Sequence, residues 1–376
     1  MIYKDFKGLK LSALGMGTMR LPTCEGDNSR IDRDAVRQML DYAFSKGVNY
    51  IDTAWGYHSG NSESVLGELL EKYPRDSFYL ATKFPGYDVA NFEKVEEIFR
   101  TQLEKCRVDY FDFYLFHNVC EKDIDAYLDR SNGLMDFLLR QKAEGRIRNI
   151  GFSTHGSLET TQRFLDAYGE HMEFCQIQLN WLDWELQKAK DKVELLGKLN
   201  IPIWVMEPVR GGKLVNLAPE YEEKLRAMRP EATAVEWAFR FVQSVPGVTM
   251  TLSGMSNMTQ LQENIETFST EDNLTEKEFS ALLELSAEMR RETTVPCTAC
   301  RYCTDHCPMG LDIPKLIELY NEQNYMKGFL VPMVISSLPE EKRPSACIGC
   351  RGCEAVCPQN IKVSEIMTHF TGLLQK

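Results

Sequence analysis

Eight of the twelve cysteines crowd into one stretch near the end of the chain and form two copies of one pattern. Each copy reads C-x₂-C-x₂-C-x₃-C-P, a spacing that lets a tight loop present three thiolates to three irons of one [4Fe–4S] cube. In two-cluster ferredoxins the fourth cysteine of each run binds the other cluster. The pattern therefore predicts two clusters, one held by Cys297, Cys300, Cys303 and Cys357, the other by Cys347, Cys350, Cys353 and Cys307.

Structural zinc is the alternative, since zinc sites also use paired C-x₂-C units. Zinc needs only four thiolates per site and has no use for a doubled four-cysteine run with a proline after each. The connection between the runs, residues 309–346, is longer than in minimal ferredoxins and contains a predicted helix over Ile313–Tyr325. The exchange of the fourth ligand therefore stays open, although cluster ligation by these cysteines is the favoured interpretation.

A second set of reactive residues lies earlier, at the ends of three consecutive strand-like runs: Asp52 and Tyr57, then Lys83, then His117. A tyrosine with a pKa near 10 donates a proton poorly at neutral pH. A nearby ammonium should lower that pKa, and a carboxylate can hold the ammonium in place. A histidine can orient a substrate oxygen by a hydrogen bond. Such a set could protonate the alkoxide that forms when a hydride reaches a carbonyl carbon.

The elements that must position these residues are short β-rich runs that alternate with amphipathic segments such as Arg33–Ser45 and Phe92–Cys106. Eight alternations in under 300 residues predict an α/β fold, a parallel (β/α)₈ barrel. A doubly wound open sheet is the rival, but no G-x-G-x-x-G follows the first strand. The eight predicted strands begin at Ala13, Tyr50, Tyr79, Asp112, Ile147, Phe174, Pro202 and Thr249.

Composition sets the broad class. The length of 376 residues suits one large and one small domain, and a change to Cys, Pro and short helical pieces places their boundary near 290. We expect a barrel over 1–290 and a small helix-and-loop, ferredoxin-like domain over 291–376. The net charge of −12 argues against nucleic-acid and membrane-surface partners. No secretory signal or spanning segment is visible, so the expected location is the cytoplasm.

Several runs together are similar to the aldo-keto reductase superfamily: NYIDTAWGYHSGNSESVLG, YLATKF, DFYLFHN, RIRNIGFSTHG and MEPVRGGKL. The resemblance covers about residues 1–270, and the cysteine-rich tail extends it to the subgroup with a ferredoxin-like domain. It implies that Asp52, Tyr57, Lys83 and His117 are the catalytic tetrad. It also implies a nicotinamide cofactor, NAD or NADP, that lies extended across the mouth of the barrel without a Rossmann fold.

The resemblance also assigns cofactor contacts. Ser153 and Gln176 match the positions that bind the carboxamide, and Met206 stands where an aromatic residue usually stacks on the nicotinamide. NADP-preferring members of the family place a lysine and an arginine where this chain has Gly254 and Gln260. Without those cations a 2′-phosphate loses its charge-assisted partners, so the choice between NAD and NADP stays open. The full set of implied contacts is Asp52, Ser153, Gln176, Met206, Gly254, Gln260, Glu263 and Asn264.

These features predict a nicotinamide-dependent oxidoreductase that interconverts a carbonyl and an alcohol. Hydride transfer moves two electrons together, whereas each cluster passes one, and a flavin mediator has no fingerprint in the sequence. Two arrangements stay open. In one, the clusters exchange electrons with the barrel or with an electron-transfer protein. In the other, they are structural or dock a partner, and the barrel works alone or as a redox-responsive binding module.

Other candidates have weaker support. Trp55, His58, Tyr87, Trp181 and Trp184 could line a substrate pocket or simply pack, and His155 lies after Ser153 on the same side of the predicted barrel. A reactive-thiol role for Cys24 or Cys120 is disfavoured, because free cysteines usually behave as small apolar groups.

Overall fold

The computed structural model describes residues 1–291, 294–325 and 327–375 of the chain. Its contacts divide the chain into two compact units, Met1–Phe279 (unit 1) and Ser280–Lys376 (unit 2). The division lies within helix α12 (Glu276–Arg291), earlier than the boundary near 290 that the change in composition suggests. Contacts of the first turn of α12 join it to unit 1, whereas composition changes only where the cysteine motifs begin. None of the described helices has the length and apolarity required to cross a membrane.

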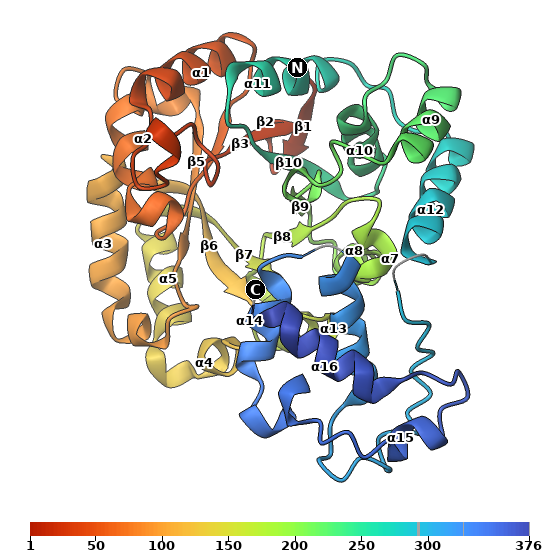
Figure 1. Cartoon of the computed structure of the whole chain (residues 1–376). Coiled ribbons are helices and arrows are strands. Elements are labelled where there is room, and N and C mark those ends of the chain that lie inside the picture. Colours follow the sequence, from red (N-terminus) through yellow and green to blue (C-terminus); the bar gives the residue numbers. More distant parts are fainter. Residues whose placement is uncertain (292–293, 326, 376) are drawn as a thin grey trace. The chain divides into compact units, whose positions relative to one another are not determined.

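Unit 1 is built on eight strands that close into a barrel, in the order β10-β3-β4-β5-β6-β7-β8-β9 (Figure 1). Every neighbouring pair within the barrel is parallel. The predicted (β/α)₈ barrel is therefore confirmed, and the open doubly wound sheet is excluded. The strands are β3 (Leu14–Gly17), β4 (Tyr50–Asp52), β5 (Tyr79–Phe84), β6 (Phe111–Val119), β7 (Ile147–Thr154), β8 (Phe174–Gln178), β9 (Ile203–Met206) and β10 (Val248–Gly254).

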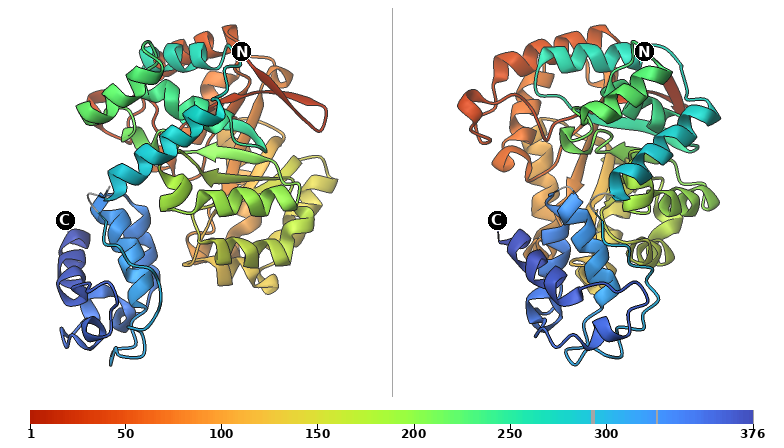
Figure 2. Two further views of the ribbon diagram at one scale, coloured as in Figure 1. Left: turned by 90° about the vertical axis from the view of Figure 1, so that its right-hand side faces the viewer. Right: turned by 45° about the vertical axis from the view of Figure 1, so that its right-hand side comes forward.

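Helices surround the strands on the outside (Figures 1 and 2). In α1 (Arg33–Ser45), Asp32 accepts a hydrogen bond from the amide of Ala35 as the N-cap. Val36, Met39, Leu40 and Ala43 are buried at three- and four-residue spacing, the pattern of one apolar face. The other helices of the ring are α2 (Ser62–Leu70), α3 (Val95–Cys106), α4 (Ile124–Leu128), α5 (Leu134–Ala143), α6 (Leu158–Tyr168), α7 (Asp183–Leu186), α8 (Ala189–Lys198), α9 (Pro219–Met228), α10 (Ala234–Gln243) and α11 (Met258–Thr267).

An N-terminal hairpin that the sequence reasoning did not predict closes the end of the barrel where the strands begin. Its strands are β1 (Tyr3–Phe6) and β2 (Leu9–Ser12), which pair antiparallel. The Phe6 ring lies 5.1 Å from that of Trp204 and 5.7 Å from that of Phe113, centroid to centroid, inside one buried cluster. This end is filled by apolar side chains, so chemistry must take place at the opposite rim, where the strands end.

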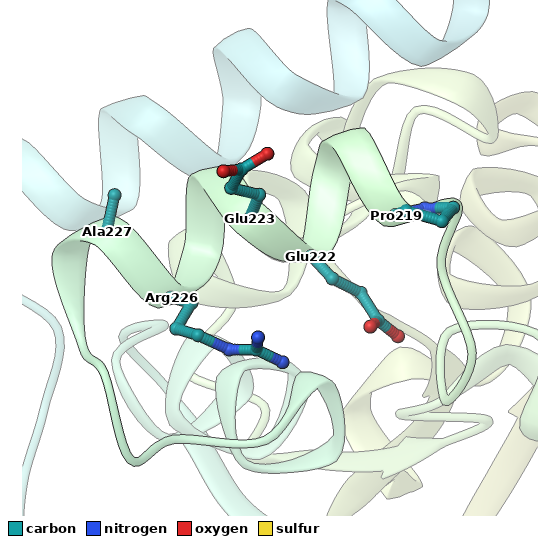
Figure 3. Close-up of a pocket in the computed structure, with 5 residues that line it drawn as sticks. All are labelled: Pro219, Glu222, Glu223, Arg226 and Ala227. Carbon is teal, nitrogen blue, oxygen red and sulfur yellow. The ribbon is translucent and has the colours of Figure 1, made fainter.

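A surface pocket of unit 1 runs along one face of α9 (Figure 3). Two of its lining residues are glutamates and one is an arginine, all with side chains that solvent can reach. It contains no residue from a strand end, so it does not position the predicted site. Its lining residues are Pro219, Glu222, Glu223, Arg226 and Ala227.

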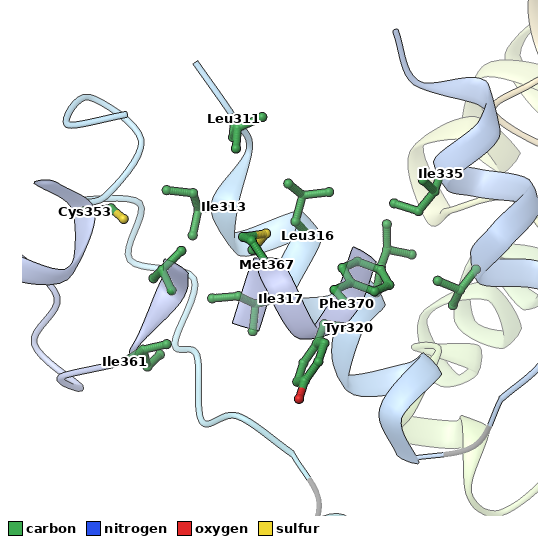
Figure 4. Packing of buried hydrophobic residues seen from close by; sticks show 13 residues of the cluster. Leu311, Ile313, Leu316, Ile317, Tyr320, Ile335, Cys353, Ile361, Met367 and Phe370 are labelled. Carbon is green, nitrogen blue, oxygen red and sulfur yellow. The ribbon is translucent and has the colours of Figure 1, made fainter. Parts of the chain in front are cut away.

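Unit 2 has a hydrophobic core of its own (Figure 4). Leu316 and Ile317 of α13 pack with Met367 and Phe370 of α16, and the Tyr320 hydroxyl and the Nδ1 atom of His369 lie 2.8 Å apart. The helix predicted over Ile313–Tyr325 is present with those bounds. Besides the part of α12 from Ser280 onward, the described α-helices of this unit are α13 (Ile313–Tyr325), α14 (Leu330–Ser337), α15 (Gly352–Ala355) and α16 (Val363–Leu374).

Candidate functional site

The four predicted catalytic residues lie at the rim where the barrel strands end. Asp52 is the last residue of β4, Lys83 lies in the last part of β5, and His117 lies in the last part of β6. Tyr57 begins a short 3₁₀ turn, Tyr57–Gly60, that follows β4. Because β4, β5 and β6 are parallel neighbours, these residues from separate stretches of sequence are brought together.

Lys83 is the centre of the group and is fully buried. Its Nζ atom donates to Asp52 Oδ1 at 2.7 Å and to the carbonyl of Thr53 at 2.7 Å, and it lies 3.5 Å from the Tyr57 hydroxyl. An ammonium has three protons, and these are three acceptors in reach. Burial disfavours the charge, but Asp52 and Tyr57 together raise the pKa of Lys83. Lys83 is therefore a cation held beside the tyrosine.

The pKa of Tyr57 differs from the sequence expectation in its net direction. Lys83 does lower it, as expected, but burial is the larger influence and raises the pKa of Tyr57 above 10, with Asp52 and Glu207 adding to the rise. Burial likewise raises the pKa of Asp52, against the effect of Lys83. Tyr57 therefore carries its proton at neutral pH, and Lys83 lowers the free energy required to remove that proton.

His117 stands beside Tyr57, with ring centroids 6.1 Å apart and planes at 80°. Tyr87 lies edge-on to its ring at 5.3 Å. Burial, aided by Lys83 and His155, holds the pKa of His117 well below 6.5, so the ring is neutral at physiological pH. Within the described part of the chain its buried Nδ1 atom has no hydrogen-bond partner. The ring can therefore hydrogen-bond an oxygen of a bound molecule.

Sequence reasoning missed a buried polar network behind Lys83. Glu63 is fully buried, and its Oε1 accepts hydrogen bonds from the Thr82 hydroxyl at 2.7 Å and from Gln102 Nε2 at 2.8 Å. Gln102 Nε2 also lies 3.0 Å from the carbonyl oxygen of Lys83. The network thus fixes the backbone that presents Lys83. One signal was available, since Glu63 shares the buried face of α2 with Leu66 and Leu70 at helical spacing.

The three residues expected at the nicotinamide lie on adjacent strands. Ser153 in β7 is the cross-strand partner of Gln176 in β8, and Met206 ends β9. The amide of Asn118 donates to the Ser153 hydroxyl at 2.8 Å, and Gln176 Nε2 lies 3.6 Å from the Met206 sulfur. Gln176 Oε1 is buried and, among the described residues, has no partner. It is an acceptor available to an amide N–H group.

The residues expected at the adenosine end lie on β10 and α11. Gly254 ends β10 and is exposed, as is Glu263. Asn264 is buried and donates to the Ser253 hydroxyl at 3.1 Å. Gln260 Oε1 accepts from the amide of Ser256 at 2.8 Å, so its side chain is turned back to its own loop. Gly254 and Glu263 are therefore open to a ligand, whereas Gln260 and Asn264 already hold the local structure.

Three of the weaker candidates, Trp181, Trp184 and Cys120, have structural surroundings that argue against a role in the site. Trp181 is buried, and Trp184 packs against Phe241 and Phe279 at 5.7 and 5.8 Å, so both serve packing. Burial raises the pKa of the Cys120 thiol to about 12, helped by Asp123, which makes that cysteine a poor nucleophile.

Four cysteines of unit 2 line one cavity together with apolar side chains, among them Ile317 and Val363. These are the four that crossover of the fourth ligand assigns to one cluster: Cys297, Cys300, Cys303 and Cys357. Burial raises the pKa of Cys303, and the nearby Cys297, Cys300 and Cys357 add to the rise. The long connection between the runs therefore does not prevent Cys357 from joining the first run.

The second run shows the matching arrangement. Burial raises the pKa of Cys353 to about 11, with contributions from Glu354, Cys307 and Cys347, so Cys307 of the first run lies among the thiols of the second. In the described residues, no three His, Cys, Asp or Glu side chains converge as ligands of a single ion. Thiols spaced around a cavity suit a cube, in which each thiolate binds its own iron.

Comparison with known proteins gives two family matches. Residues 13–287 match the aldo/keto reductase family, and residues 296–361 match the 4Fe-4S dicluster domain. Among curated proteins, the chain is 29% identical over 214 residues to a probable aldo-keto reductase of Glycine max, a match that covers 55% of this chain and 58% of that protein. It is 24% identical to an uncharacterized oxidoreductase of Bacillus subtilis, over 73% of this chain and 92% of that protein.

Among solved structures, an aldo-keto reductase from Bacillus halodurans in its holo form superposes with a TM-score of 0.62 at 23% identity. The match covers 76% of this chain and 96% of that one. At this level of identity the likeness supports the barrel fold.

Proposed function

Because the chain belongs to the aldo-keto reductase family, we propose that it is a nicotinamide-dependent enzyme that interconverts a small carbonyl compound and its alcohol. The observation that carries the proposal is the buried contact of Lys83 with both Asp52 and Tyr57, with His117 beside Tyr57 at the rim where the barrel strands end. Asp52, Tyr57, Lys83 and His117 are then the catalytic residues.

Each residue has a separate task in the proposed reaction. Tyr57, which carries its proton at neutral pH, donates that proton to the oxygen of the substrate carbonyl. Lys83 stabilises the phenolate that remains, and Asp52 holds Lys83 in position at 2.7 Å. The neutral His117 orients the substrate oxygen through a hydrogen bond. In the direction of alcohol oxidation, the same groups accept the proton.

The residues at the rim fit a nicotinamide cofactor, which supplies or accepts the hydride when bound. The Oε1 atom of Gln176, which has no partner among the described residues, would accept from the carboxamide N–H of the nicotinamide, with Ser153 on the neighbouring strand. Met206 offers an apolar surface to the ring. Gly254 and residues of α11, with Glu263 exposed there, lie where the adenosine end would bind. Asp52 contributes to cofactor binding indirectly, because it accepts a hydrogen bond from Lys83 and fixes its position.

The cofactor preference follows from two positions. Gly254 has no side chain, and the Gln260 side chain is engaged by the amide of Ser256. Neither offers a cation to the 2′-phosphate that distinguishes NADP from NAD. The proposed enzyme therefore uses NADH at least as well as NADPH.

For residues 291–376 we propose a ferredoxin-like function, with the barrel function confined to 1–290. The proposed ligands are Cys297, Cys300, Cys303 and Cys357 for one cluster and Cys347, Cys350, Cys353 and Cys307 for the other. The cavity lined by the first four, with apolar walls, supports this ligand set. The clusters would transfer electrons one at a time, to the barrel or to a partner protein.

Tyr57→Phe tests the catalytic proposal. The substitution removes the hydroxyl and keeps the ring that packs near His117. We expect turnover of aldehydes and ketones to fall by at least about a hundredfold, the usual contribution of a positioned proton donor. Binding of NADH, measured by quenching of tryptophan fluorescence, should stay within about twofold of the unsubstituted protein. Retained turnover would contradict the assignment of Tyr57.

An anaerobic visible spectrum tests whether the clusters and the barrel exchange electrons. If they do, adding NADH should bleach the broad cluster absorption. If only dithionite bleaches it, the clusters do not take electrons from the nicotinamide, and the barrel works without them.

A further inference from the structure

One arginine from the beginning of the barrel lies beside the proposed nucleotide path. Arg20 follows β3, and its side chain extends along Gly254, at the end of β10. A Cβ atom on Gly254 would stand 3.2 Å from the Cβ of Arg20 and 3.3 Å from its Cγ and Cδ. The Nη2 atom of Arg20 lies 3.1 Å from the place where a Cβ of Gly211 would be. The side chain thus runs from the end of β10 to the turn Arg210–Gly212.

Two hydrogen bonds hold the peptide group that joins Arg20 to Leu21. The Ser256 hydroxyl donates to the Arg20 carbonyl at 2.9 Å, and the amide of Leu21 donates to Nε2 of the buried His58 at 3.1 Å. The Nδ1 atom of His58 lies 2.9 Å from the Asn28 carbonyl, which fixes that ring in turn. Arg20 is nevertheless exposed, so a fixed backbone presents a guanidinium that solvent, and a ligand, can reach.

Among the described residues, the carboxylate of Glu207 lies near the guanidinium. Glu207 follows Met206, and its Oε2 atom lies 4.0 Å from the same Gly211 position. Burial raises the pKa of Glu207, as does Asp183, while Arg20, Arg210 and Lys213 oppose that rise. The guanidinium of Arg20 and the carboxylate of Glu207 thus both lie near Gly211, which has no side chain.

We propose that Arg20 binds the diphosphate bridge of the nicotinamide dinucleotide and that Glu207 competes with the phosphates for its guanidinium. This inference rests on the proposed function, which places the nicotinamide at Met206 and the adenosine near Gly254. What lies between those ends of a dinucleotide is the diphosphate, and Arg20 spans that interval. A planar guanidinium binds phosphate oxygens in a bidentate manner.

The 2′-phosphate of NADP is the other anion that Arg20 could bind. The position of Nη2 favours the diphosphate, because it lies toward Gly211 and Glu207, next to Met206, whereas the Arg20 atoms nearest to Gly254 are the aliphatic carbons of the side chain. A contact with the diphosphate serves NADH and NADPH equally. Its loss should therefore weaken both dinucleotides by the same factor.

The test measures binding of ADP-ribose and of 2′-phospho-ADP-ribose to the full-length protein by isothermal titration calorimetry. These ligands share the diphosphate and differ in the 2′-phosphate, and neither has a nicotinamide that could react. We expect Arg20→Ala to weaken both by a similar factor, about tenfold to a hundredfold, as for loss of a charged hydrogen bond. Arg20→Lys should give an intermediate loss, and Glu207→Gln should tighten both ligands. Arg30→Ala, which removes an exposed arginine paired with Glu25, is the control and should change neither.

The outcomes distinguish the role of Arg20 from the proposed nicotinamide-dependent function. If the unsubstituted protein binds both ligands and Arg20→Ala binds them equally well, the role of Arg20 is wrong and the proposed function stands. If Arg20→Ala weakens only 2′-phospho-ADP-ribose, Arg20 binds the 2′-phosphate and the assignment to the diphosphate is overturned. If the unsubstituted protein binds neither ligand, both the inference and the nicotinamide-dependent function are refuted.

Discussion

Lys83→Met tests the electrostatic arrangement at the centre of the barrel rim. Methionine keeps most of the length of the side chain and removes the ammonium, so Asp52 loses its partner at 2.7 Å. Asp52 is only 2% exposed and cannot regain water. Removal of one member of a buried ion pair costs about 3–5 kcal/mol, because the remaining charge is buried without compensation. We expect a loss of that size in the free energy of unfolding at pH 8.5.

The loss should depend on pH in a defined direction. Burial already raises the pKa of Asp52, and removal of Lys83 takes away the main influence that lowers it. A carboxyl whose pKa is higher in the folded than in the unfolded state destabilises the fold as pH rises, because the unfolded chain ionises first. In Lys83→Met, Asp52 can take up a proton at pH 5.5, and the loss of stability should be smaller there.

Urea unfolding followed by tryptophan fluorescence measures the effect. All five tryptophans lie in unit 1, so their emission reports on the barrel alone. The control is Lys83→Met combined with Asp52→Asn, which removes both charges and should recover much of the lost stability. The reasoning is refuted if the Lys83→Met variant is no less stable than the double variant. It is also refuted if Lys83→Met lowers the free energy of unfolding equally at pH 5.5 and at pH 8.5.

Two more predictions address other parts of the chain. Cys350→Ser should lower the iron content of the anaerobically purified protein from about eight to about four irons per chain, since each cube needs its thiolates. The matched substitution Cys24→Ser in unit 1 should leave the iron content unchanged. An equal iron count in the two variants would refute the ligand assignment. Burial raises the pKa of Asp123 to about 7, above its usual 3.8. Asp123 should therefore destabilise unit 1 as pH rises from about 4 to about 7, by at most about 4 kcal/mol. Asp123→Asn should flatten that part of the pH profile of urea unfolding, and an unchanged slope would contradict it.

The features of the fold that could be predicted from the sequence are local ones. Helix Arg33–Ser45 and helix Ile313–Tyr325 have the predicted bounds, because their apolar spacing is set within one segment. The helix predicted to begin at Phe92 begins at Val95, after a 3₁₀ turn over Val89–Lys94. The hairpin β1–β2 was missed because its strands are four residues each and its turn, Lys7-Gly8, is a weak signal even though both residues adopt positive φ.

Some features of the candidate site could also be predicted from the sequence, and others could not. Asp52, Lys83 and His117 could be placed because each lies at or near the end of a recognisable strand. The support of Lys83 by Glu63 and Gln102 could not, because it joins two helices across the back of a strand. The contact of Arg20 with Gly254 depends on closure of the barrel, which brings the first strand beside the last. The net rise in the pKa of Tyr57 was missed because the depth of burial cannot be read from the motif.

The most direct test of the account is transfer of deuterium from the C4 position of labelled NADH to a carbonyl substrate. The protein is incubated with (4-²H)NADH, prepared separately in each C4 stereochemistry, and a panel of aldehydes and ketones that begins with 4-nitrobenzaldehyde. The products are then analysed by mass spectrometry. If the protein transfers hydride from the nicotinamide, the alcohol carries deuterium on the former carbonyl carbon when one of the two labelled forms is used. Formation of alcohol without the label from either form, or no alcohol from any member of the panel, would contradict it.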